Sequence, residues 1–274
     1  MPSRFYSCQR LGMTFPNDIA QREAYILEQV QNGNYSAKWA WVKSTNGTST
    51  AYFRVMSDAL EVDGTRINVS ARLEQQIADV LGCMLLTPKL ADMIWMQRAL
   101  TLIPYPRQIT SSTQAMIEHS GKIDSGIAAT GQDPDSLICT VGKHWVLDKA
   151  LNSHPGKAEN YGWHFAGASF QGITGEVCAS LIKDPATGMY YRLIQGCGWA
   201  HDISHVDYSQ TCVLVRKKCL VEGNRMNLSD VLSDATLAPL VSHNGVTTIF
   251  RQPGVPELSQ VAPDDDEVPA DSGA

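Results

Sequence analysis

From Leu137 onward, short strand-like segments follow one another with glycines and turns between them, and no helical segment separates them. The predicted strands span 137–140, 144–147, 159–165, 177–182, 189–194 and 211–220. Consecutive strands without intervening helices pair antiparallel, because a parallel pair needs a long crossover connection. We therefore predict an α+β fold with a largely antiparallel C-terminal β-sheet, and not a parallel α/β sheet.

The N-terminal half is expected to be rich in helix. Apolar residues recur at helical spacing in residues 17–31 and 71–81, and Thr87 followed by proline has the residue types that begin a third helix. Two predicted strands, 35–43 and 50–55, flank an Asn-Gly turn. The pattern predicts a helix-rich N-terminal half packed on the C-terminal sheet.

Changes in composition divide the chain into four parts. They are an N-terminal α/β subdomain at 1–105, a linker or long loop at 106–136, a β-rich catalytic or binding subdomain at 137–251, and a disordered acidic tail at 252–274. Serine, threonine and glycine dominate the linker, although a helix could form at 113–119. Proline, acidic and small residues dominate the tail, which has too few apolar residues to pack.

Charge and hydropathy exclude several classes of partner. The net charge of −6 gives no positive surface of the kind that binds nucleic acid or anionic lipid. No apolar stretch approaches the roughly 20 residues of a membrane span, and residues 1–10 lack the apolar region of a signal peptide. We expect no nucleic-acid partner, no membrane span, and a protein that is cytoplasmic or released without a signal. The oligomeric state stays open.

No motif for a cofactor is present in the sequence. The seven cysteines are irregularly spaced and form no C-x-x-C pair, which argues against a zinc ribbon or a thioredoxin-like site. A glycine-rich dinucleotide motif and a P-loop are both missing. We therefore expect no cofactor.

Histidines and aromatic residues gather in the predicted β-rich region. Five of the seven histidines lie between positions 144 and 205. In the run Tyr161-Gly162-Trp163-His164, regular strand alternation places Tyr161 and Trp163 on one face and His164 on the other. The predicted substrate-binding aromatics are Tyr161, Trp163, Trp199 and Tyr208. Such residues suit a cleft for a glycan or peptide polymer, with rings for stacking and histidines for proton transfer.

A set of polar residues in the same region predicts nucleophilic catalysis. His164 would act as general base or acid, and Asp207 would orient it. Ser209 would be the nucleophile, with Cys212 as the alternative, and Lys143 would stabilise developing negative charge.

A metal site is a second possibility for these histidines. In a helix, His201 and His205 would share one face and could hold a metal ion. The extended character of their neighbours and the missing glutamate of H-E-x-x-H favour a site without metal.

Two resemblances accompany these residues. The segment entering a strand at Gly142-Lys143, the run Tyr161-Gly162-Trp163-His164 and the run Val206-Asp207-Tyr208-Ser209 together resemble a group of uncharacterised bacterial proteins over residues 20–245. In that group a histidine and a glycine follow the serine, where this chain has Gln210 and Thr211.

The second resemblance points to a substrate. Tyr-Gly-x-His followed by Ser209-x-x-Cys212 is similar to the His…Ser-His-Gly-Cys pattern of L,D-transpeptidases. Those enzymes act on peptidoglycan stem peptides through a cysteine acyl-enzyme. The hypothesis is a hydrolase or transferase of a cell-wall polymer, with peptidoglycan as the substrate. The alternatives are a non-catalytic glycan- or protein-binding module and a structural assembly protein such as one of a phage particle.

Overall fold

A computed structural model describes residues 15–139, 141–167, 170–171, 177–178, 182–183 and 190–261. Part of the predicted strand 177–182 and most of the predicted acidic tail fall outside these residues.

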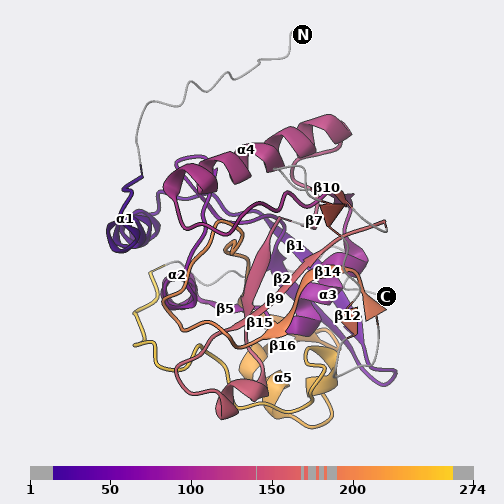
Figure 1. The fold of residues 1–274 in the computed structure, drawn as a ribbon. Helices are drawn as coiled ribbons and strands as arrows, with labels where there is room; N and C mark the ends of the chain where they lie inside the picture. Colours follow the sequence, from indigo (N-terminus) through magenta and orange to yellow (C-terminus); the bar gives the residue numbers. More distant parts are fainter. Residues whose placement is uncertain are drawn as a thin grey trace, which may run out of the picture.

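The main sheet joins strands from both ends of the sequence. Its antiparallel order is β1 (Trp39–Thr45), β2 (Thr50–Met56), β15 (Leu214–Val221) and β16 (Asn224–Asn227), and β5 (Cys83–Leu85) also pairs with β15. The β1–β2 turn forms because the Asn46 side chain accepts hydrogen bonds from the backbone of Thr48 and Ser49. Figure 1 shows the indigo strands β1 and β2 beside the orange strands β15 and β16.

A second antiparallel sheet carries most of the predicted site residues. Its order is β14 (Leu193–Gly198), β9 (Glu159–His164) and β8 (Lys143–Val146), with β9 in the centre. Strands β6 (Leu100–Thr101) and β7 (Ile138–Cys139) form a parallel pair, and β7 immediately precedes β8 in the sequence. The remaining two-stranded pairs are β3 (Glu61–Val62) with β4 (Thr65–Arg66), β10 (Phe170–Gln171) with β11 (Val177–Cys178), and β12 (Ile182–Lys183) with β13 (Tyr190–Tyr191).

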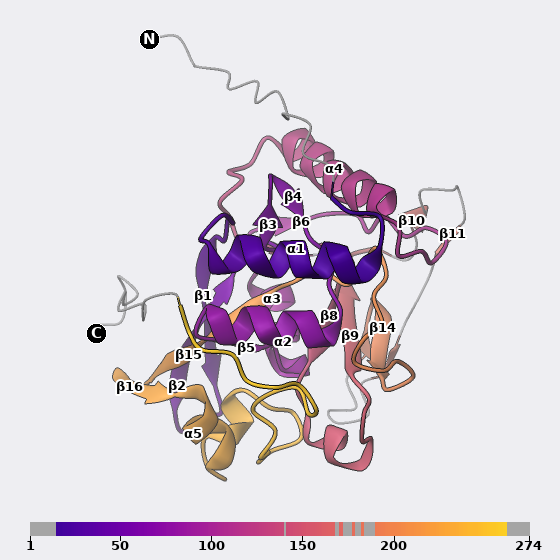
Figure 2. The same cartoon turned by 90° about the vertical axis from the view of Figure 1, so that its left-hand side faces the viewer.

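The helices are distributed along the whole chain. They are α1 (Ile19–Gln31), α2 (Ala71–Val80), α3 (Pro88–Gln97), α4 (Thr113–Thr130) and α5 (Leu228–Ser233), with 3₁₀ turns at Lys149–Ser153 and Ala238–Leu240. Side chains cap the first four at their N-termini, through Asp18, Ser70, Thr87 and Ser112. Figure 2 shows α1 and α2 running side by side, with α4 across one end of the molecule.

The α+β class is confirmed, but the predicted division into a helical half and a β half is wrong. The N-terminal strands β1, β2 and β5 belong to the same sheet as the C-terminal strands β15 and β16. Their buried side chains also form a continuous core with residues from both halves. Local periodicity cannot reveal this arrangement, because it depends on pairing between segments more than 150 residues apart.

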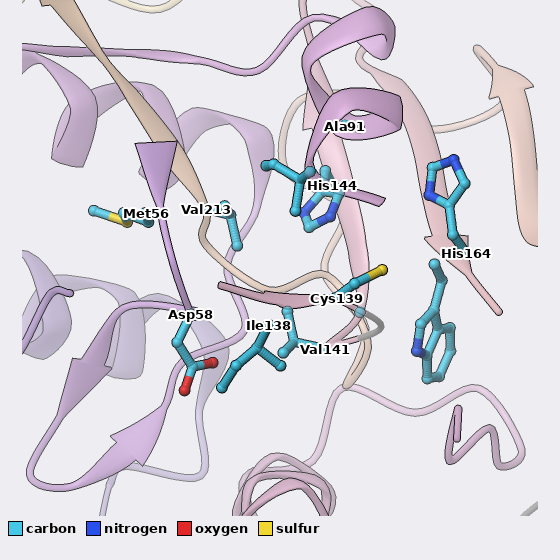
Figure 3. Close-up of a pocket in the computed structure, with 12 residues that line it drawn as sticks. Met56, Asp58, Ala91, Ile138, Cys139, Val141, His144, His164 and Val213 are labelled. Carbon is cyan, nitrogen blue, oxygen red and sulfur yellow. The ribbon is translucent and has the colours of Figure 1, made fainter. Parts of the chain in front are cut away.

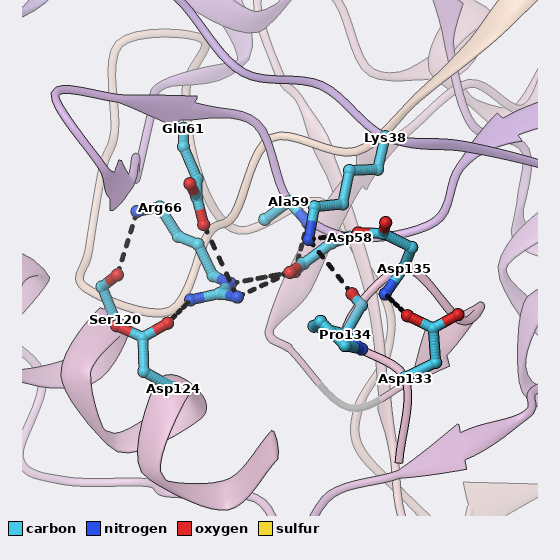
Figure 4. A network of polar contacts seen from close by, with 10 residues as sticks. All are labelled: Lys38, Asp58, Ala59, Glu61, Arg66, Ser120, Asp124, Asp133, Pro134 and Asp135. Carbon is cyan, nitrogen blue, oxygen red and sulfur yellow. Dashed lines mark hydrogen bonds and ion pairs between the residues drawn. The ribbon is translucent and has the colours of Figure 1, made fainter. Parts of the chain in front are cut away.

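The predicted linker contains an 18-residue helix. Helix α4 is held to the β3–β4 hairpin by Arg66, which forms hydrogen bonds with both carboxylate oxygens of Asp58 and an ion pair with Asp124 at 2.5 Å (Figure 4). The backbone N–H of Arg66 donates to Ser120 on the same helix. The sequence suggested a helix only at 113–119, because much of the stability of the full helix comes from these tertiary contacts and not from its residue types.

The start of the predicted disordered tail is packed. Gln252 is fully buried, and Arg251 forms an ion pair with Asp79 of α2 at 2.8 Å. Residues 251 and 252, at the start of this segment, are therefore held against the rest of the chain. Residues 262–274 lie outside the described part of the chain. Among the described helices, none is long and apolar enough to cross a membrane.

The Arg66 network generates a stability prediction. Arg66→Ala leaves the buried Asp58 carboxylate without its guanidinium, so unfolding free energy should fall by about 3–5 kcal/mol. Asp124→Ala removes the partner that is 47% exposed, and should cost less than about 1 kcal/mol. Urea denaturation measures both. A loss below about 1 kcal/mol for Arg66→Ala would show that this network does not anchor α4.

Candidate functional site

The candidate site is centred on the buried carboxylate of Asp92. One oxygen, Oδ1, accepts hydrogen bonds from the Tyr161 hydroxyl at 2.8 Å and from His164 Nε2 at 2.7 Å. The other, Oδ2, lies 2.6 Å from His243 Nε2. Asp92 itself is 0% exposed. Two imidazoles and a phenol therefore converge on one carboxylate, two of them from strand β9 and one from the segment that carries His243.

The N-terminus of α3 positions both Asp92 and its partner His243. Thr87 caps the helix through its side-chain oxygen, and the same hydroxyl donates to the carbonyl of Val241 at 2.6 Å. This bond fixes the segment that carries His243 beside the helix. Trp95 lies one turn after Asp92 on the same helix face, and its ring stacks on His164 with centroids 5.7 Å apart.

A backbone distortion in β9 brings Tyr161 and His164 to the same carboxylate. Gly162 has φ of +104° and Trp163 has φ of +62°, a conformation that costs free energy for a non-glycine residue. A Cβ on Gly162 would also lie 3.2 Å from the His144 ring. The predicted alternation, with Tyr161 and His164 on opposite faces, is therefore wrong. Trp163 instead packs away from Asp92, against Tyr208.

A small cavity adjoins His164. Its lining residues include Cys139, His144 and His164 (Figure 3). The cavity volume is ≈ 10 Å³, about what one water molecule requires. Within the described part of the chain, the buried Nδ1 of His144 makes no hydrogen bond of normal geometry. Cys139, His144 and His164 thus line one cavity.

The site keeps its carboxylate ionised and one of its imidazoles neutral. Burial disfavours the charge on Asp92, but the hydrogen bonds from His164, His243 and Tyr161 outweigh it, so the pKa of Asp92 lies below its usual value. Burial lowers the pKa of His144 to about 3, and the positive charge of His164 acts in the same direction. His144 is therefore neutral at physiological pH.

The face of the second sheet that carries Tyr161 also carries a further buried polar residue, Glu159. Directly paired residues of antiparallel strands share a face, so Tyr161 lies with His144, and Glu159 with Val146. Glu159 is 1% exposed. Burial raises its pKa to about 7, and the negative charge of Asp148 adds to this effect. Asp148 in turn accepts a hydrogen bond from Asn244, the neighbour of His243.

A second polar cluster lies on the opposite face of β8. Lys143 and His144 are consecutive strand residues and point to opposite faces. Lys143 Nζ forms an ion pair with Asp207 Oδ2 at 2.8 Å, and the Ser209 hydroxyl donates to Asp207 Oδ1 at 2.5 Å. Burial opposes the ionisation of Asp207, but the charge of Lys143 and the hydrogen bonds of Ser209 keep its pKa low. The predicted site residues Lys143, Asp207 and Ser209 thus lie together, whereas His164 contacts Asp92 instead.

The other predicted residues, His201, His205 and Cys212, lie outside the Asp92 cluster. His205 Nε2 is 3.9 Å from Asp207, and its ring stacks on His201 with centroids 3.8 Å apart. Among the described residues, no group of three or more His, Cys, Asp or Glu side chains could hold a metal ion. Cys212 is 0% exposed, and burial raises its pKa well above the usual value.

The predicted substrate-binding aromatics are mostly buried. Tyr161, Trp163 and Tyr208 are each no more than 3% exposed. The Tyr208 hydroxyl accepts a hydrogen bond from the backbone N–H of Arg107 and donates one to the Arg107 carbonyl. Trp199 stacks on His154 with ring centroids 4.7 Å apart. Of the four, only Trp199 lies partly at the surface.

Sequence reasoning missed Asp92, His243 and Cys139 as site residues. Asp92 lies in a segment whose cap and apolar stripe indicate only a helix. Its one distinguishing signal is that an acidic side chain stands between apolar residues. Its neighbours Ala91, Met93 and Ile94 are all buried in the structure. A buried carboxylate needs partners, so this position could have been singled out.

No family model matches this chain, and comparisons with curated proteins and with solved structures find no significant match. The function is therefore inferred from the geometry of the site itself.

The raised pKa of Glu159 predicts a pH-dependent stability. Between about pH 4.5 and pH 7 the unfolded chain releases this proton while the folded chain keeps it, so stability falls as pH rises through this window. The full effect is about 3 kcal/mol. Glu159→Gln should remove this slope in urea denaturation, whereas Glu28→Gln, on the exposed surface of α1, should retain it. An unchanged slope in Glu159→Gln would contradict the assignment.

Proposed function

We propose that this protein is a hydrolase or transferase that acts on a cell-wall polymer, with the peptide part of peptidoglycan as its substrate. The observation that carries the proposal is the hydrogen bond from His164 to the buried carboxylate of Asp92, next to a cavity that Cys139 also lines. A carboxylate, an imidazole and a thiol are the three components of a cysteine acyl-transfer site.

In this proposal Asp92 has the role that the sequence suggested for Asp207. Its carboxylate fixes the His164 ring through Nε2 and stabilises the imidazolium that forms when the ring accepts a proton. Nδ1 of His164 is then the nitrogen that exchanges the proton with the reacting groups. Tyr161 and His243 hold the carboxylate in place, and they are positioning residues.

Cys139 is the proposed nucleophile. His164 takes the thiol proton, and the thiolate attacks the carbonyl carbon of an amide bond. The carbon–nitrogen bond then breaks, the amine leaves with the proton from His164, and a thioester on Cys139 remains. Attack by water, with its proton passing to His164, releases a carboxylic acid and restores the thiol. Attack by a second amine forms a new amide instead, which is the transferase outcome.

The geometry favours Cys139 over the two nucleophiles that the sequence suggested. The Ser209 hydroxyl donates to Asp207, which is itself paired with Lys143 on the other face of β8. Cys212 is fully buried, and its raised pKa disfavours the thiolate. Cys139 alone among these three shares a cavity with His164.

The substrate class follows from the chemistry and from the resemblance to L,D-transpeptidases. A thiol nucleophile with a histidine base is suited to acyl transfer at amide bonds. Peptidoglycan stem peptides supply such bonds and are the substrates of those enzymes. The non-catalytic alternative relied on an exposed aromatic platform, and the burial of Tyr161, Trp163 and Tyr208 weakens it.

Incubation with purified peptidoglycan tests the proposal, with muropeptide products identified by mass spectrometry. Cys139→Ala and His164→Ala should each reduce turnover by at least roughly 10³-fold, and Asp92→Asn by roughly 10²–10⁴-fold. Cys197→Ala, a cysteine outside the cavity, is the matched control and should retain activity. Circular dichroism and thermal unfolding check that each variant is folded.

The outcomes separate the alternatives. Full turnover by Cys139→Ala together with loss of turnover in Ser209→Ala would restore the serine mechanism. Binding of peptidoglycan with no product from the native chain would favour the non-catalytic module.

A further inference from the structure

A second cavity lies between helix α2, the main sheet and the C-terminal segment 250–257. Its volume is ≈ 280 Å³, and it shares no lining residue with the cavity beside His164. Figure 2 shows the yellow C-terminal segment passing between α2 and α5, and both helices contribute to the lining. A cavity of about 150 Å³ holds benzene. The second cavity therefore has room for an organic molecule of about twice that size.

The C-terminal segment is fastened to α2 through one buried carboxylate, that of Asp79. Its Oδ2 forms an ion pair with Arg251 at 2.8 Å and accepts from the backbone N–H of Leu258 at 3.1 Å. Its Oδ1 accepts from the Gln75 amide at 2.9 Å, and the Gln75 oxygen accepts from the backbone N–H of Gln252 at 2.7 Å. These contacts fix the wall within the chain itself, so the cavity is preformed, as ligand sites usually are.

Two charged residues of the lining have no partner within the protein. Arg216 and Lys218 line a groove on the outer side of the main sheet, whereas Lys217 lies between them and lines the cavity. This placement is expected because successive strand residues point to opposite faces. Glu257 lines the cavity from the C-terminal segment. Among the residues that the structure describes, neither the Lys217 ammonium nor the Glu257 carboxylate forms an ion pair or a hydrogen bond.

The other charges of the lining are already neutralised, because Arg251 and Asp79 pair with each other. The cavity therefore offers one cation and one carboxylate that remain available. A ligand with a single negative charge would satisfy Lys217 and leave Glu257 facing that charge. A ligand with a single positive charge would have the reverse effect. A zwitterion satisfies both residues, and each contact is a charge-assisted hydrogen bond.

The cavity also has an apolar part. Met84 of β5 is 4% exposed, and Phe250 packs half-buried against the core. Ligand sites combine apolar walls with a few polar groups that fix the orientation of the ligand. An aromatic ring suits a wall made of a thioether and a phenyl group.

We propose that this cavity binds a free α-amino acid with a large apolar side chain. The carboxylate of the ligand contacts Lys217, its ammonium contacts Glu257, and its side chain packs against Phe250 and Met84. The size agrees, since phenylalanine has about twice the non-hydrogen atoms of benzene. The proposal does not depend on the chemistry at Asp92, because the two cavities are lined by different residues.

Isothermal titration calorimetry of the full-length chain at neutral pH tests the proposal with three matched probes. L-phenylalanine carries both charges, hydrocinnamic acid lacks the ammonium, and phenethylamine lacks the carboxylate. L-phenylalanine should bind at least about tenfold more tightly than either of the other two, because each loses one hydrogen-bonded charge pair.

Two variants assign each charge to its partner. In Glu257→Gln, the preference for L-phenylalanine over hydrocinnamic acid should disappear. In Lys217→Met, the preference for L-phenylalanine over phenethylamine should disappear. Lys122→Met, on the exposed surface of α4, and Glu28→Gln, on the exposed surface of α1, are the matched controls and should keep both preferences. Thermal unfolding checks that every variant is folded.

Three results would overturn the proposal. Absence of heat from L-phenylalanine at millimolar concentration would show that the cavity does not bind an amino acid of this kind. Unchanged preferences in folded Lys217→Met and Glu257→Gln would place the binding elsewhere. Tighter binding of L-alanyl-L-phenylalanine than of L-phenylalanine would assign the cavity to a peptide and not to a free amino acid.

Discussion

The buried charge of Asp92 is the constraint on which the arrangement of the site depends. A carboxylate removed from water is tolerated only when hydrogen-bond donors surround it. Here the donors come from Tyr161 and His164 on β9 and from His243 near the C-terminus. Helix α3, the central strand of the second sheet and a late loop are therefore held together by one ionised group.

The distorted backbone of β9 is the local consequence of this requirement. Only a reversal of the normal side-chain alternation lets Tyr161 and His164 reach the same oxygen, and the positive φ angles of Gly162 and Trp163 provide it. Backbone strain of this kind persists where the surrounding structure fixes it, and it concentrates at functional sites. The strain supports a chemical role for His164 more strongly than the density of histidines in the sequence does.

The two faces of β8 separate two roles that the sequence could not separate. Lys143, Asp207 and Ser209 do converge, as their proximity in the β-rich region suggested, but they form a closed, buried ion-pair cluster. His164 and His144 lie on the other face with Cys139 and Asp92. A shift of one residue along a strand changes the face, so sequence spacing alone grouped residues that the sheet keeps apart.

Local features were predictable and long-range pairings were not. Apolar periodicity at 17–31 and 71–81 and the Thr87-Pro88 start marked three helices correctly, because each signal depends only on neighbouring residues. The pairing of β15 with β2 and the approach of His243 to Asp92 join residues more than 150 positions apart. With neither a homologous family nor a complete motif to link these segments, their contacts appear only in three dimensions.

The central claim is that Asp92 and His164 activate the thiol of Cys139. The most direct measurement is the rate of iodoacetamide alkylation of Cys139 at neutral pH, followed by peptide mass spectrometry in the native chain and in His164→Ala. The account predicts that Cys139 alkylation slows by roughly tenfold or more in the variant, because the imidazole no longer favours the thiolate, while alkylation of Cys197 is unchanged. Equal rates at Cys139 in the two folded proteins would contradict it.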